Sequence, residues 1–381
     1  MSRLNFVDSS RGLAVVLAML SHALLQFSAN VDVLETVRPW ISIVTRSATP
    51  TFMILFGIMI EVAYLRKLRE GSALRTVQTR LLARAITCYA LFVCITVAAF
   101  ATGKLGGVET FKALSYQANG RFGTILKIYA VLFLLILVTL PLARRFGAWF
   151  FLGFAAAAWI VRWVAMQTAL SDLYVLHFLI GHAKGFGPAI LVGMTFVAFG
   201  MAIGEALTGR SKWRLAAILL SGAVLQVAWS IGEHGYMEWM VQTVKTYRWI
   251  NDPVYFAYGI VACALSLAIF ALWHSFDTIP APTALDTLGR DTLLFYGGGN
   301  IVINLLPYYG GTAVWGALMP VAFILFLIWA TFRKVQVFEL SNQYLFNLPN
   351  RILTAYIAMR DRIVAVLMPS TQPQRPRRAA D

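Results

Sequence analysis

The residues of this chain whose types and spacing could do chemistry lie near its start: Asp8, Arg11 and His22. Ionisable side chains within apolar, membrane-length stretches are costly, so each is a functional candidate. Arg11 and His22 are eleven residues apart, which on an α-helix is about 20° beyond three full turns and about 16.5 Å along the axis. Both therefore face the same side. With Arg11 at the inner membrane interface, His22 lies near the middle of a hydrocarbon core about 30 Å thick.

This arrangement suits the transfer of a group between two substrates. Arg11 could hold an anionic group at the cytoplasmic mouth while the reactive end of the same molecule extends to His22. Asp8 can pair with Arg11, because residues three apart are neighbours on a helix surface. Neutral imidazole can accept a proton from a hydroxyl group. The alternative is a structural histidine that is hydrogen-bonded to a neighbouring helix.

The elements that must position these residues are membrane helices. The chain has 381 residues, 59% hydrophobic and 13% charged, with a mean hydropathy of +0.70. Soluble domains are about 25% charged, so the composition excludes a soluble enzyme, a disordered chain and a disulfide scaffold. We expect an all-α polytopic membrane protein, because ten apolar runs are long enough to span a bilayer and lack the alternation of barrel strands. These runs cover roughly residues 11–29, 39–64, 85–103, 124–143, 146–167, 187–206, 215–232, 253–273, 290–306 and 312–332.

The charge balance predicts the orientation. Lys and Arg total 32 against 17 Asp and Glu, a net charge of +15. Most of the basic residues fall on one set of alternate loops, which places both ends of the chain in the cytoplasm by the positive-inside rule. We expect a multi-pass protein of a bacterial inner membrane, surrounded by lipid and without a nucleic-acid partner.

Three regions are expected along the chain. Residues 1–334 form the transmembrane domain, residues 335–368 form a basic amphipathic segment on the cytoplasmic membrane surface, and residues 369–381 form a disordered basic tail.

Several motifs resemble a known family. Asp8-x-x-Arg11-Gly12-x-Ala14, followed by Arg11-x10-His22, is similar to the opening signature of the acyltransferase-3 family within the transmembrane acyltransferase superfamily. The segment 51–57, which ends in Phe56-Gly57 where the family usually has Ser-Gly, resembles its second helix. The segments 80–84 and 288–296 resemble its third-helix entry and its late Leu-Gly-Arg motif. Many relatives have a histidine shortly after that late motif, where this chain has Gly297-Gly298-Gly299-Asn300.

The resemblance implies an activity and site residues. Members move an acyl group, commonly acetyl, from cytoplasmic acyl-CoA to a sugar hydroxyl. It implies that His22 is the catalytic base and that Arg11 helps hold the donor; Asp8, which the helix spacing pairs with Arg11, is counted with them in the catalytic group. Acyl-CoA is then a cosubstrate, and no tightly bound cofactor is expected.

Further candidates would bind the donor. Arg80 and Arg84 are four residues apart on one helix face and suit the phosphates of CoA, although ordinary inner-loop charge explains them equally. Arg290, Tyr296 and Asn300 accompany the three glycines. The glycines leave room for a slender pantetheine chain, or they permit tight helix packing.

The acceptor would meet residues nearer the outer side. Arg46 could hold an acidic acceptor or an oxyanion, or extend its charge to the interface. Glu233 and His234 lie among aromatic residues, which are typical of a carbohydrate site or of an interfacial belt. His177 and His182 are five residues apart, a poor spacing for a shared metal, and no metal site is expected.

These observations predict an acyl-CoA-dependent O-acyltransferase that acts on a cell-envelope saccharide or lipid-linked saccharide. A transporter or flippase of an envelope precursor, and a non-catalytic scaffold, are the alternatives. A homo-oligomer is left open.

Overall fold

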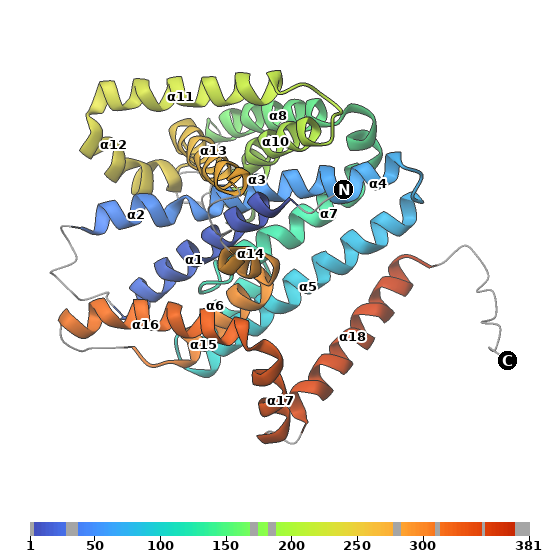
Figure 1. The fold of residues 1–381 in the computed structure, drawn as a ribbon, viewed down its shortest axis with the longest axis vertical. Helices are drawn as coiled ribbons and strands as arrows, with labels where there is room; N and C mark the ends of the chain where they lie inside the picture. The colour runs from blue at the N-terminus through green and yellow to red at the C-terminus, as the bar shows by residue number, and fades with distance from the viewer. Residues whose placement is uncertain are drawn as a thin grey trace.

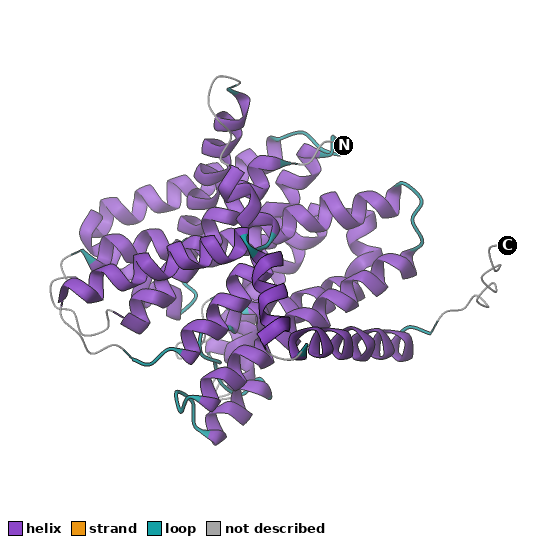
Figure 2. Cartoon of the chain, turned by 60° about the horizontal axis from the view of Figure 1, so that its bottom comes forward, coloured by secondary structure: helices purple, strands orange, loops and turns teal. Residues whose placement is uncertain are grey.

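The computed structural model describes residues 4–27, 37–167, 174–181, 188–276, 283–308, 313–344 and 347–369. All regular secondary structure in these ranges is helical (Figure 2), so the expected all-α fold class is confirmed. The helices, including three π-helical segments named η, are α1 Asn5–Phe27, α2 Arg38–Arg46, α3 Ala48–Met59, η2 Ile60–Leu65, α4 Arg66–Arg69, α5 Leu74–Ala101, α6 Gly107–Leu114, α7 Thr124–Phe146, α8 Ala148–Met166, α9 Tyr174–Ile180, α10 Ile190–Leu207, α11 Arg214–His234, α12 Tyr236–Gln242, η4 Thr243–Tyr247, α13 Pro253–Ser275, α14 Thr283–Arg290, η5 Leu294–Gly298, α15 Gly299–Leu305, α16 Ala313–Phe332, α17 Lys334–Tyr344 and α18 Leu348–Leu367.

Within the described ranges, nine helices are long and apolar enough to cross a membrane. The expected run 290–306 is not a long unbroken helix, because the structure divides this region into α14, η5 and α15. Glycine weakens helices by about 1 kcal/mol relative to alanine, and the π-helical turn ends within Gly297-Gly298-Gly299. Nine of the ten expected spans are therefore long helices among the described residues, and the tenth is a divided segment.

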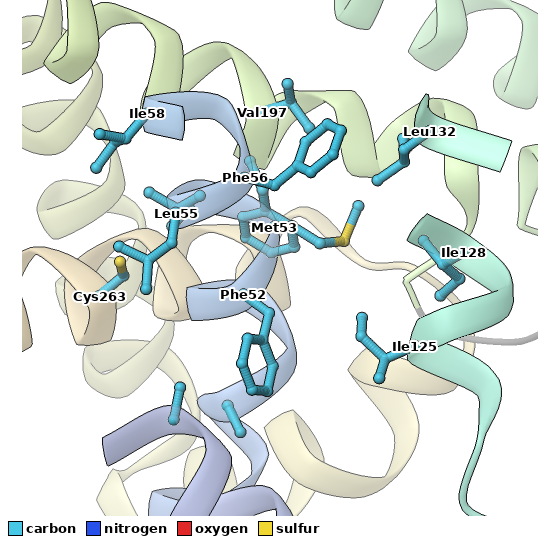
Figure 3. Close-up of a cluster of buried hydrophobic side chains, with 14 of the residues drawn as sticks. Phe52, Met53, Leu55, Phe56, Ile58, Ile125, Ile128, Leu132, Val197 and Cys263 are labelled. Carbon is cyan, nitrogen blue, oxygen red and sulfur yellow. The ribbon is translucent and has the colours of Figure 1, made fainter. Parts of the chain in front are cut away.

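Helix α3 lies near the middle of the bundle (Figure 1), and the two most buried of the candidate spans are α10 and the span 38–69 that contains α3. Phe52, Met53 and Phe56 of α3 pack in a buried apolar core with side chains of α7, α10 and α13 (Figure 3). The peripheral helices present large apolar side chains outward: Leu225 and Trp229 of α11 are 70% and 72% exposed. Such a surface matches a surrounding lipid phase rather than water.

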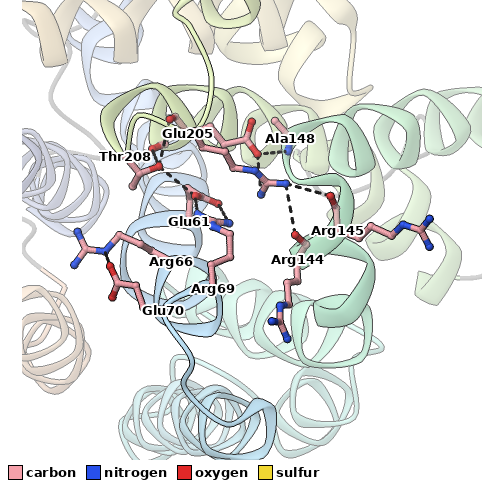
Figure 4. A network of polar contacts seen from close by, with 11 residues as sticks. Glu61, Arg66, Arg69, Glu70, Arg144, Arg145, Ala148, Glu205 and Thr208 are labelled. Atoms are coloured by element: carbon pink, nitrogen blue, oxygen red, sulfur yellow. Dashed lines mark hydrogen bonds and ion pairs between the residues drawn. The ribbon is translucent and has the colours of Figure 1, made fainter.

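The bundle has two ends, which we name from α1. The Arg11 end contains the start of α1, α4 and the last turns of α7 and α10. There, Glu61 pairs with Arg69, and Glu205 accepts a hydrogen bond from the Ala148 amide and pairs with Arg210 at 3.2 Å (Figure 4). The opposite Gln26 end contains the last turn of α1 and the end of α15, where Gln26 Nε2 donates to the carbonyl of Leu306 at 3.1 Å.

The C-terminal helices lie to one side of the bundle (Figure 1). Helix α18 packs beside α5, and the Tyr356 hydroxyl donates to Thr87 Oγ1 at 2.8 Å. Most apolar side chains of α18 are exposed, including Ile352 and Val366. The membrane-surface location of residues 335–368 stays a prediction, and residues 370–381 of the expected tail lie outside the described residues.

Candidate active site

Helix α1 crosses α14 at backbone contact. A Cβ atom added to Gly12 would lie 2.1 Å from the Leu285 carbonyl oxygen, and one added to Gly289 would lie 1.8 Å from the Asp8 carbonyl oxygen. Only glycine fits at either position. Two sequence motifs that are far apart in the chain therefore pack against each other, and their crossing fixes α15 relative to α1.

Polar contacts support this crossing at the Arg11 end. Ser9 Oγ donates to Asp286 and lies 2.9 Å from Nε2 of His274, which is itself 3.5 Å from Asp286. These three residues belong to α1, α13 and α14, and all of them are largely shielded from solvent. The sequence analysis missed this cluster.

The crossing brings His22 to Asn300. Nδ1 of His22 lies 2.7 Å from Oδ1 of Asn300, and Nδ2 of Asn300 donates to the Tyr296 carbonyl at 2.8 Å. The second contact orients the amide so that its oxygen faces the imidazole. We therefore assign the histidine proton to Nδ1, which leaves the lone pair on Nε2.

Two aromatic residues enclose the imidazole. The Phe122 ring stacks on His22 with centroids 4.5 Å apart, and Tyr296 meets it edge-on at 5.8 Å. The Tyr296 hydroxyl donates to the Phe122 carbonyl at 2.7 Å, which holds the loop before α7 over the site. Phe122 has φ of +61°, a conformation that costs a bulky residue about 1–3 kcal/mol and that occurs at functional sites.

Nε2 of His22 is the atom available for proton transfer. Among the residues that the structure describes, it has no hydrogen-bond partner, and the side chain is only partly buried. A base that is oriented through one ring nitrogen and free at the other has the arrangement that general-base catalysis requires.

The three glycines of the late segment do not share one role. A Cβ at Gly297 would clash with Leu91 of α5, and one at Gly299 would lie 2.8 Å from Leu327 and 2.9 Å from Met19. Tight packing therefore accounts for these two positions. Asn300 is fully buried against His22, a contact that the sequence analysis missed; its expected contact with the donor stays a prediction.

The basic candidates of the Arg11 end gather near η2. Arg11 pairs with Asp8 at 3.1 Å, and its Nη2 lies 3.9 Å from Sδ of Met59, the residue before η2. Arg84 lies beside Tyr64 within η2, with Arg80 also near that hydroxyl. Arg80 and Arg84 are both exposed, so they are available to a soluble anion.

The remaining candidates lie apart from His22. Arg290 is exposed, and its Nε donates to the carbonyl of Asp286 in its own helix at 3.2 Å. Glu233 and His234 lie at the end of α11, 3.9 Å from each other, without a described contact to His22. His177 is buried, and His182 lies outside the described residues. The described ranges contain no group of three metal-ligating side chains.

Comparison with known proteins decides the family. Residues 3–244 match the catalytic domain of heparan-α-glucosaminide N-acetyltransferase, over more than half of the chain. The chain belongs to this family of transmembrane acetyltransferases. No curated protein and no solved structure matches it.

The family membership refines the sequence-based expectations. A multi-pass membrane acetyltransferase is confirmed, whereas membership of the acyltransferase-3 family specifically is not shown. The matched region includes Asp8, Arg11 and His22 and ends before α13. Asn300, which orients His22, therefore lies outside it.

Proposed function

We propose that this protein transfers an acetyl group from cytoplasmic acetyl-CoA to a hydroxyl or amino group of a cell-envelope saccharide, with His22 as the general base. One observation carries the proposal. In a chain of an acetyltransferase family, a membrane-embedded histidine is held at Nδ1 by Asn300 and is free at Nε2 among the described residues.

The donor would enter at the Arg11 end, which the positive-inside rule places in the cytoplasm of a bacterial cell. Arg80 and Arg84 suit the CoA phosphates, because guanidinium groups donate two parallel hydrogen bonds to phosphate. Arg11 contacts Met59 just before η2, and Arg84 lies beside Tyr64 within η2. An acyl-pantetheine arm that follows α1 would present its thioester about 16.5 Å from Arg11, the axial distance to His22.

The acceptor would approach from the Gln26 end. Its hydroxyl or amine attacks the thioester carbonyl carbon while Nε2 of His22 takes the acceptor proton. A C–O or C–N bond forms, the C–S bond breaks, and the departing CoA thiolate receives a proton from the imidazolium. Asn300 keeps the imidazole oriented throughout, because its side-chain oxygen accepts a hydrogen bond from the Nδ1–H group of His22.

The name of the family refers to an amine acceptor, and the sequence resemblance refers to a hydroxyl. Two matched acceptors distinguish an amine from a hydroxyl acceptor. The protein in detergent is incubated with acetyl-CoA and a disaccharide that carries either glucosamine or glucose at its non-reducing end. An amide product withstands alkaline hydroxylamine, whereas an ester product does not.

The test of the proposed function is His22→Ala. We expect the variant to insert and fold, with an unfolding temperature lowered by the loss of the Asn300 contact, but to release CoA thiol at least about 100-fold more slowly, the size of a general-base contribution. Leu225→Ala is the control, since it truncates a side chain of α11 that is 70% exposed and has no place in the site. Wild-type thiol release by His22→Ala would refute the proposal. Absence of acceptor-dependent thiol release by the wild type would favour a transporter or a scaffold.

A further inference from the structure

Helix α15, which carries Asn300, has few hydrogen bonds of its own. It contains seven residues, Gly299–Leu305, and the last four carbonyl groups of an α-helix have no partner within the helix. The chain leaves the helix at Leu306, whose backbone is extended. Carbonyl groups without a partner are costly in apolar surroundings, so the end of α15 needs hydrogen-bond donors from other elements.

The segment that follows α5 supplies most of these donors. Lys104 Nζ donates to the carbonyl groups of Ile303 and Asn304 at 3.2 Å and 2.8 Å. The same ammonium group also donates to the Leu306 carbonyl. Thr102 Oγ1 donates to the Asn304 carbonyl at 2.9 Å. The three N–H donors of one lysine are therefore matched by three carbonyl groups at the end of α15.

The positive charge of Lys104 suits this place. Free carbonyl groups give the C-terminal end of a helix a partial negative charge, which favours a cation there. A second cation lies nearby, because Nζ of Lys104 and the Arg121 guanidinium are 5.3 Å and 4.9 Å from the centroid of the Tyr308 ring. Burial, together with the charge of Arg121, lowers the pKa of Lys104 from 10.5 to about 8. At pH 7 the side chain therefore remains an ammonium group with all three donors.

Helix α1 contacts the same short helix at both of its ends. His22 contacts Asn300 near the start of α15. Gln26 follows His22 by four residues and hence lies on the same face of α1. Its Nε2 donates to the carbonyl groups of Leu306 and Pro307 at 3.1 Å and 2.9 Å. The position of α15 relative to the imidazole is thus set partly at its C-terminal end, where Lys104 also binds.

We propose that Lys104 is a positioning residue of the transfer reaction: its ammonium group fixes the end of α15 and thereby keeps the Asn300 side chain against His22. Asn300 and Asn304 are one helical turn apart, about 6 Å along the axis, so a displacement at the Asn304 carbonyl also moves Asn300. The imidazole would then lose the contact that orients it as a general base. The catalytic role rests on the proposed function, whereas the fixing of α15 does not.

The fixing of α15 is measured without substrates. Full-length protein in detergent at pH 7 is compared with Lys104→Met by hydrogen–deuterium exchange of the backbone amides of residues 299–306. Because exchange reports local opening, we expect these amides to exchange about tenfold or more faster in Lys104→Met, the scale of a hydrogen bond to a charged group. Lys104→Arg should restore slow exchange, since a guanidinium also donates several hydrogen bonds. Lys112→Met is the matched control, because Lys112 is an exposed lysine of the neighbouring α6.

The catalytic role is measured by steady-state release of CoA thiol. We expect Lys104→Met to lower kcat about tenfold, as when an orienting partner of a histidine is lost. The KM for acetyl-CoA should not change, because the proposed donor contacts of Arg80 and Arg84 lie at the opposite end of the bundle. A double-mutant cycle with Asn300→Leu gives the decisive comparison. If Lys104 acts through Asn300, Lys104→Met causes no further loss of kcat in the Asn300→Leu background.

A second variant keeps the proposal testable if Lys104→Met does not fold. Lys104→Gln retains N–H donors but loses the charge, so we expect the same changes at a smaller size. Wild-type exchange of α15 in both variants would overturn the proposal, and so would an equal effect of Lys112→Met or a full further loss of kcat in the Asn300→Leu background. If exchange accelerates but the wild type releases no thiol with any acceptor, the proposed function fails and the fixing of α15 by Lys104 stands.

Discussion

At the scale of single residues, the orientation and tautomer of His22 depend on Asn300. The sequence shows that an imidazole lies in the first apolar run and faces the same side as Arg11. It could not show the partner, because Asn300 is 278 positions away and approaches only through the crossing of α1 and α14. Nor could it show that Phe122 stacks on the ring, since a loop residue in a left-handed conformation leaves no periodic pattern.

Asn300→Leu tests this dependence. The substitution keeps the side-chain size but removes the oxygen that accepts the hydrogen bond from Nδ1–H of His22. The imidazole can then rotate or change tautomer. We expect kcat for thiol release to fall by about 10- to 100-fold, the range seen when an orienting partner of a histidine is removed from metal sites.

Asn304→Leu is the matched control, because Asn304 is also fully buried, lies one helical turn further along α15 and contacts Ile95 rather than His22. Equal losses of activity in the two variants would show that Asn300 acts only through the packing of α15.

At the scale of elements, irregular helices coincide with the site. η2 follows Met59, which contacts Arg11, and contains Tyr64, which lies beside Arg84. η4 ends immediately before Arg248, and η5 ends immediately before α15 with its Asn300. Extra residues in π-helical turns are frequent at functional sites, because they redirect the side chains that follow. Hydropathy patterns predicted the apolar runs but not these turns. A π-helical turn shows in a sequence as a shift in the position of the apolar face, and a helix that is apolar on most sides has no distinct face in which such a shift can be seen.

Gly12→Ala tests the crossing of α1 and α14. A methyl group there would overlap the Leu285 carbonyl, and overpacking of this kind costs about 1–3 kcal/mol. We expect a lower unfolding temperature and a loss of thiol release, because α15 would move away from His22.

The control for this substitution is Gly222→Ala in α11, where nothing lies within 4 Å of the added atom. There the same change should leave activity intact and stabilise the protein by about 0.5–1 kcal/mol. A Gly12→Ala variant with wild-type stability and activity would show that α14 does not position the site.

At the scale of the whole molecule, the two ends differ in how their charges are balanced. At the Arg11 end, some arginines have buried acidic partners, as in Arg69 with Glu61 and Arg210 with Glu205, while Arg80 and Arg84 are exposed. At the Gln26 end, Arg46 and Arg248 have none within the described structure. The composition predicted the membrane fold because lipid contact demands apolar side chains. It could not predict this difference, which arises from pairing between distant segments.

The orientation of these ends is the last prediction. Ser72 lies in the exposed turn between α4 and α5 at the Arg11 end, and Val108 is 63% exposed on α6 near the Gln26 end. Ser72→Cys and Val108→Cys would be placed separately in a background where Cys88, Cys94 and Cys263 are alanine. A membrane-impermeant maleimide should label the Val108→Cys variant in cells with a permeable outer layer, and the Ser72→Cys variant only after the inner membrane is opened.

The reverse labelling pattern would contradict the proposed direction of transfer. Arg80 and Arg84 would then face away from the cytoplasmic pool of acetyl-CoA, and Lys104 and Arg121 at the Gln26 end would face that pool instead. His22 could still act as a base in that orientation, but the donor and the acceptor would have to exchange ends. Sidedness therefore decides which of the two basic clusters binds the CoA phosphates.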